Sequence, residues 1–160
     1  MTKKQKNVLG EDLELCSSDP LTGWYRDGCC NTDENDKGVH TVCAKVSNEF
    51  LNWCKEAGND LITPHPEFGF PGLKDGDCWC VCASWYARAI DANKGCPIFL
   101  KRTHENTLKL IPIETLKKIR NRLILNYIFP YLGPPLPSGV TQVIFWEGSF
   151  ISHVLQWIQF

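Results

Sequence analysis

Some of the cysteine and histidine residues of this sequence lie in three short groups. They are the pair Cys29-Cys30, the His40-x-x-Cys43 step and the Cys80-x-Cys82 pair. Thiolate and imidazole are the ligands that zinc and iron prefer, and a four-coordinate site needs only four of them. The sequence therefore suggests a bound zinc or iron ion. Its candidate ligands are Cys29, Cys30, His40, Cys43, Cys80 and Cys82.

The spacing of these residues leaves two other roles open. Zinc ribbons and fingers use Cys-x-x-Cys knuckles, which this chain lacks, and cysteine is also commonly buried as a small hydrophobic residue. A thiol can instead be a nucleophile or a redox group if a base lies beside it. The candidate catalytic residues are Cys29, Cys30, His40 and His104. The alternatives to a metal site are thus a thiol-dependent enzyme or redox protein, and a non-catalytic binding module with buried cysteines.

The elements around these groups indicate an α+β domain. Turn motifs such as Asp19-Pro20 and Asp27-Gly28 predict a loop-rich segment over residues 7–40, with one short strand at Trp24-Tyr25. Ser47 as an N-cap, followed by a periodic apolar face, predicts a helix over 48–57.

The second half of the domain mixes helices and strands around the Cys80-x-Cys82 pair. The pattern predicts a strand over 78–82, which would place Cys78, Cys80 and Cys82 on one face. It then predicts a helix over 83–94, strands at 98–100 and 108–111, and a helix over 113–120. If the protein is an enzyme, we expect the loop over 63–77 to rim a pocket for a small metabolite.

Composition limits the classes of partner. A net charge of -1 gives no basic surface for nucleic acid, and no uninterrupted apolar run reaches the ~18 residues that a membrane-spanning helix needs. A small molecule or a metal ion remains the expected partner. The first residues do not read as a secretory signal, so we expect a cytoplasmic location and nine reduced cysteines, with disulfides the less favoured alternative.

The last forty residues differ in character from the rest of the chain. Only Arg122 and Glu147 carry charge beyond residue 120, and the segment is rich in apolar and aromatic residues. We expect a domain over 7–119 and an atypical apolar tail over 120–160 that could contact a protein partner.

Several long motifs resemble one known family. They are Asn7-Val8-Leu9-Gly10, Asp19-Pro20-Leu21-Thr22-Gly23, Tyr25-Arg26-Asp27-Gly28-Cys29-Cys30, His40-Thr41-Val42-Cys43-Ala44, Trp79-Cys80-Val81-Cys82-Ala83 and Thr103-His104-Glu105. In these stretches the chain is similar to the family catalogued as domain of unknown function 2237. The resemblance covers residues 7–119 and does not extend to the tail.

The resemblance implies a compact two-layer α/β domain and carries no assigned activity. The cysteine and histidine positions that recur in that family are Cys16, Cys29, Cys30, His40, Cys43, Cys80, Cys82 and His104. Cys54, Cys78 and Cys96 fall outside them. The chain has Trp85-Tyr86 where the family usually has Arg-Trp, so no role of that arginine carries over.

Overall fold

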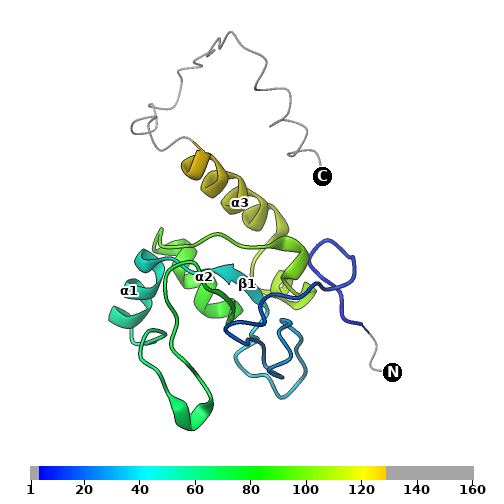
Figure 1. Cartoon of the computed structure of the whole chain (residues 1–160). Helices are drawn as coiled ribbons and strands as arrows, with labels where there is room; N and C mark the ends of the chain where they lie inside the picture. Colours follow the sequence, from blue (N-terminus) through cyan, green and yellow to red (C-terminus); the bar gives the residue numbers. More distant parts are fainter. Residues whose placement is uncertain (1–3, 129–160) are drawn as a thin grey trace. The chain divides into compact units, whose positions relative to one another are not determined.

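A computed structural model of the chain describes residues 4–128 (Figure 1). Its strands are β1 (Val42–Lys45) and β2 (Cys78–Val81), and its α-helices are α1 (Asn48–Glu56), α2 (Ala83–Asp91) and α3 (Ile113–Ile128). Single turns of 3-10 helix are η1 (Pro66–Phe68), η2 (Leu100–Arg102) and η3 (Glu105–Lys109). Helices combined with a small sheet confirm the predicted α+β class. Of the apolar tail predicted over 120–160, residues 129–160 lie outside the described residues.

The two strands form an antiparallel pair whose register places Cys43 directly opposite Cys80. Successive side chains of a strand point to opposite faces of the sheet. Val42 and Ala44 therefore share one face with their partners on β2, and this face packs into the main hydrophobic core. Cys43 and Cys80 share the other face and pack in a separate, smaller cluster of buried cysteines.

Helices α1 and α2 fill the main core. Phe50 and Leu51 of α1 and Tyr86 and Ala89 of α2 are each no more than 1% exposed and pack with the residues of the sheet face that carries Val42. Leu116 of α3 joins the same core. The loop-rich N-terminal segment supplies the remaining members of the cysteine cluster on the opposite face, so the sheet lies between helices and loop.

The helix predictions are confirmed in place. Helix α1 begins after Ser47, whose hydroxyl accepts the backbone N–H of Phe50 at 3.2 Å, as an N-cap should. Helix α2 starts at the predicted residue and ends a turn earlier, at Asp91. Helix α3 continues past residue 120 to Ile128, so the expected boundary between domain and tail falls within it. The division into domain and tail itself stays a prediction.

The strand predictions need correction. The Trp24-Tyr25 pair lies in a turn, and residues 105–109 form η3, so the strands predicted there are wrong. Near 98–100 the structure has one isolated bridge, between Ile98 and Ala44. The strand β1 was not predicted, because its Val-Cys-Ala run is buried on both faces and shows no alternation of apolar and polar residues.

Within residues 4–128, none of the helices combines the length and the apolar character needed to cross a lipid bilayer.

Candidate functional site

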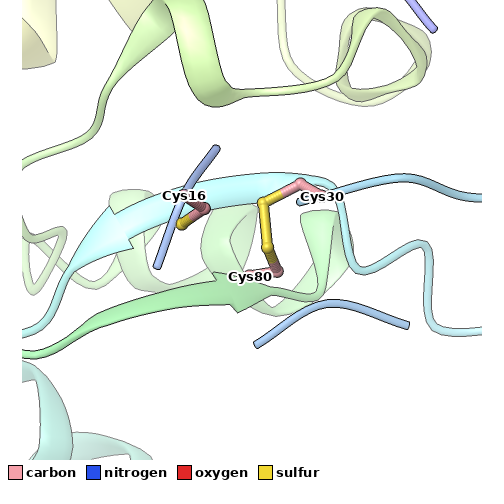
Figure 2. A group of neighbouring side chains, drawn as sticks. All are labelled: Cys16, Cys30 and Cys80. Carbon is pink, nitrogen blue, oxygen red and sulfur yellow. A yellow bond between two sulfur atoms is a disulfide. The ribbon is translucent and has the colours of Figure 1, made fainter. Parts of the chain in front are cut away.

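Two disulfides lie side by side on the face of the sheet that is opposite the main hydrophobic core. Cys16 bonds to Cys43 with a sulfur–sulfur distance of 2.06 Å, and Cys30 bonds to Cys80 at 2.10 Å. The sulfurs of Cys16, Cys30 and Cys80 all lie within 4.8 Å of one another, and Figure 2 shows the Cys30–Cys80 bond with Cys16 beside it. We call these four residues the sulfur cluster. Each of them is at most 4% exposed.

The expectation of reduced thiols is wrong for these four cysteines. It rested on the N-terminal sequence and the compartment that this sequence suggested, which say nothing about which sulfurs meet in space. The register of the sheet places Cys43 against Cys80, and the N-terminal loop then brings one partner to each of them.

Hydrogen bonds hold the loop in the position that makes this pairing possible. The hydroxyl of Thr22 accepts the backbone N–H of Cys80 at 2.9 Å, and the Gly28 carbonyl accepts the N–H of Cys16 at 2.8 Å. Gly28 has a φ of +83°, and a Cβ there would lie 2.7 Å from a methyl carbon of Leu15. Only glycine therefore suits this turn between the two loop cysteines.

A second group of side chains joins Cys82, His40 and Asp36. The Nδ1 of His40 lies 2.6 Å from Oδ1 of Asp36, and the His40 side chain also interacts with the thiol of Cys82. Because Asp36 engages Nδ1, the Nε2 atom is the one left for the thiol. We call these three residues the thiol–imidazole–carboxylate array. A cysteine, a histidine and a carboxylate in this order form the arrangement of thiol nucleophile, base and orienting group.

The Asp36 carboxylate is fixed and ionised. Its side chain is fully buried, and its oxygens also accept the hydroxyl of Thr32 at 2.9 Å and the backbone N–H of His40 at 2.8 Å. Burial opposes ionisation, but the hydrogen bonds from His40 and Thr32 outweigh it, and the pKa of Asp36 is lowered. Asp36 therefore orients the imidazole and stabilises its charged form.

The His40 imidazole is held from several sides. The ring of Trp24 stacks on it with centroids 5.9 Å apart and an interplanar angle of 11°. A Cβ on Gly38 would lie 2.5 Å from Cε1 of His40, so the chain approaches the ring as closely as only glycine allows. The interaction with Cys82 is the largest of the effects that raise the pKa of His40, to about 9, with burial opposing and Asp36 adding to the rise.

The backbone carbonyl of Val39 joins the two halves of the array. It accepts the N–H of Thr41 at 2.8 Å and the N–H of Ala83, the first residue of α2, at 2.9 Å. Val39 itself has a φ of +50°, a left-handed conformation that is costly for a β-branched residue. Strain of this kind is characteristic of functional sites. Here this conformation lets the carbonyl of Val39 link the loop that carries His40 to helix α2, which starts after Cys82.

Cys82 occupies the N-cap position of α2. The first N–H groups of a helix have no partner within it, and together with the helix dipole they favour a negative charge at this end. A cysteine beside an imidazole and at a helix N-terminus is in the setting of reactive cysteines in enzymes. Burial raises the pKa of the free thiols Cys29, Cys54, Cys78 and Cys96.

A cavity of about 580 Å³ borders the array on the side of Asp36. It lies between the loop of residues 32–39 and η3, and its wall combines acidic and basic side chains with apolar ones. The lining residues are Thr32, Asp33, Glu34, Asp36, Lys37, Val39, Asn106, Lys109 and Leu110. The predicted rim, the loop over 63–77, supplies none of them.

The residues predicted as site members are thus distributed over several places. Cys30, Cys43 and Cys80 lie in the sulfur cluster, and His40 and Cys82 lie in the array. Cys29 is partly exposed and belongs to neither group, with its backbone N–H donated to Asp27.

His104, the remaining candidate, has a local partner of its own. It is buried, and its Nδ1 accepts the N–H of Asn106 at 2.9 Å, which caps η3. Burial lowers the pKa of His104, which favours the neutral ring that such a cap requires.

Sequence reasoning missed two members of these groups. Asp36 is not among the predicted site residues, although its spacing of four from His40 is a usable signal. Cys16 recurs in the family motifs but was not among the candidate ligands, because no second cysteine lies near it in sequence.

A family model described as "uncharacterized protein conserved in bacteria", domain of unknown function 2237, matches residues 6–120. No curated protein matches the chain.

Proposed function

The chain belongs to the uncharacterised family of domain of unknown function 2237, and we propose that it is a thiol-dependent enzyme in which Cys82 is the nucleophile. One observation carries the proposal: His40 contacts both Cys82, at the start of α2, and the buried carboxylate of Asp36. The stacked Trp24 and the left-handed Val39 support it, because the first holds the imidazole ring in place and the second is a backbone strain of the kind found at functional sites.

The reaction that suits this array is acyl transfer from a small ester or thioester. The sulfur of Cys82 attacks the acyl carbon, a carbon–sulfur bond forms, and the bond to the leaving group breaks. His40 gives its proton to the leaving group and then takes one from a water molecule, whose oxygen bonds to the acyl carbon as the carbon–sulfur bond breaks, so that the acid is released and the Cys82 sulfur is freed. Asp36 keeps Nδ1 engaged throughout, so that Nε2 stays directed at the reacting atoms.

The test is hydrolysis of a panel of small aryl esters and thioesters by the purified full chain. Cys82→Ala and His40→Gln should each lower kcat/KM by about 100-fold or more, the usual contribution of such groups. Cys78→Ser and His65→Gln are matched controls, because both residues lie outside the array and are partly exposed. Equal activity in the Cys82→Ala variant and the unaltered chain would refute the proposal.

A cytoplasmic location is part of the same proposal, and it agrees with a nucleophile that must stay reduced. In that compartment disulfides are commonly transient or redox-sensing. The sulfur cluster therefore calls for an explanation separate from that of the array.

A further inference from the structure

We infer that the sulfur cluster is a redox-controlled zinc site, in which the four cysteines hold one Zn²⁺ when both disulfides are reduced. The ligands are Cys16, Cys30, Cys43 and Cys80. This set leaves out Cys29, His40 and Cys82 of the ligands that the sequence suggests. It is independent of the proposed enzyme function, which uses other side chains.

The positions of the sulfurs support a tetrahedral site. Zinc–sulfur bonds of about 2.3 Å place the four sulfurs of a tetrahedron about 3.8 Å apart. The sulfurs of Cys16, Cys30 and Cys80 already lie within 4.8 Å of one another, and Cys43 is bonded to the first of them. Once the two sulfur–sulfur bonds are broken, small side-chain rotations can lengthen the distance between the sulfurs of each former disulfide. The same rotations can shorten the distance between the two former disulfides. The backbone can stay where the sheet register holds it.

The surroundings suit a closed, structural site. All four cysteines are at most 4% exposed, and Phe99 packs against them as a partly buried cover. Four sulfur ligands leave no open position for water, so such a zinc would fix structure and would not activate a nucleophile.

A positive charge lies at the edge of the cluster. The Cζ atom of Arg102 lies 4.7 Å from the centroid of the Phe99 ring, which packs against the four cysteines. A zinc tetrathiolate has a net charge of two minus, which this guanidinium would partly compensate.

The exchange balances with a dithiol reductant and a zinc ion. Two equivalents of dithiol supply four electrons and four protons, break both disulfides to give four thiols, and become two disulfides themselves. Zinc then displaces the four thiol protons and forms four zinc–sulfur bonds. Two equivalents of a small-molecule disulfide reverse the exchange: they take up the four electrons and four protons and become four thiols, while the zinc ion is released and the two protein disulfides form again.

Both states tie the same three parts of the chain together. Cys16 and Cys30 lie in the N-terminal loop, Cys43 in β1 and Cys80 in β2. Without disulfides or metal, the loop would lose its covalent attachment to the sheet. Zinc binding should therefore be coupled to folding of the reduced chain.

The experiment uses the full chain, reduced with a phosphine in the absence of oxygen and titrated with Co²⁺ as the probe, then with Zn²⁺. We expect one Co²⁺ per chain, with the strong visible bands and the sulfur-to-cobalt charge transfer of tetrahedral thiolate coordination, and complete displacement by Zn²⁺. The oxidised chain should give neither signal. Cys43→Ser and Cys16→Ser should each weaken binding by at least 100-fold, whereas Cys82→Ser should leave it within about twofold.

Two results would overturn the inference. One is a reduced chain that gives no tetrahedral cobalt spectrum at micromolar Co²⁺, whether circular dichroism shows it folded or unfolded. The other is a spectrum that persists in Cys43→Ser and Cys16→Ser but disappears in Cys82→Ser. Native mass spectrometry of the reduced chain with Zn²⁺ gives an independent count of bound ions, and a metal-free mass would also contradict the site.

Discussion

His40 is the residue on which the account of the array depends, because it contacts both other members. Its imidazole has an ordinary pKa of 6.5, which is raised to about 9 by Cys82 and Asp36 against the effect of burial. At neutral pH the ring is therefore charged. A charged ring beside a thiol favours the thiolate, whereas a neutral ring would first have to accept the proton of the thiol.

The raised pKa predicts how Cys82 affects His40. Replacing Cys82 by alanine removes the largest contribution, so the pKa of His40 should fall, while Asp36 still opposes the effect of burial. An NMR titration of the histidine ring carbons in both proteins measures the change. An unchanged pKa of His40 in Cys82→Ala would show that the two side chains do not interact.

The same shift predicts a pH-dependent stability. A group whose pKa is higher in the folded than in the unfolded state stabilises the fold fully below its unfolded pKa and loses this effect as pH rises through its folded pKa. The difference in unfolding free energy between the protein and His40→Gln should be largest below pH 6.5 and should shrink by about pH 9. Urea unfolding at several pH values tests this, and a difference that grows with pH would contradict it.

The site was only partly predictable at the residue scale. The types of His40 and Cys82 and their motifs were visible in the sequence, but their mutual contact depends on the left-handed Val39. The sequence gives no sign of that conformation, because β-branched residues rarely adopt it. Asp36 lies four residues before His40, but its burial, which makes it a partner of the imidazole, is visible only in the structure.

At the scale of elements, the two disulfides attach a loop with few regular hydrogen bonds to a two-stranded sheet. They close loops with sequence separations of 27 and 50 residues. A cross-link that closes such loops stabilises a protein chiefly by restricting the unfolded chain.

Removing one cross-link should therefore have a measurable cost. The Cys16→Ala/Cys43→Ala double variant should lose about 3–4 kcal/mol of unfolding free energy under oxidising conditions, given its 27-residue separation. Guanidinium unfolding measures the loss. Cys29→Ser, which alters a partly exposed thiol outside both bonds, should stay within about 0.5 kcal/mol. A double variant as stable as this control would show that the loop is held by other contacts.

The elements themselves were predictable where a periodic pattern existed. Helix α1 has a cap and an apolar face, and it appears where expected. The strand β1 is short, and its sequence does not alternate between apolar and polar residues. The helix η3 stands where a strand was predicted, because His104 caps it. Both outcomes are decided by tertiary contacts that local sequence does not encode.

At the scale of the molecule, the same two stretches of chain build both centres. His40 and Cys43 lie around the start of β1, and Cys80 and Cys82 around the end of β2. Strand alternation directs Cys43 and Cys80 to the sulfur cluster, whereas β2 ends at Val81 and Cys82 begins α2. For this reason the residues that the sequence suggests as one metal site lie in two centres with different chemistry.

The central claim is that Cys82 is the reactive thiol of this protein, and site-resolved alkylation tests it most directly. The oxidised full chain is treated with limiting iodoacetamide at pH 7, and the five free cysteines are followed by peptide mass spectrometry. Cys82 should react at least about tenfold faster than the partly exposed Cys29 and Cys78, and His40→Gln should abolish that advantage. A rate for Cys82 no greater than those of Cys29 and Cys78 would contradict the account.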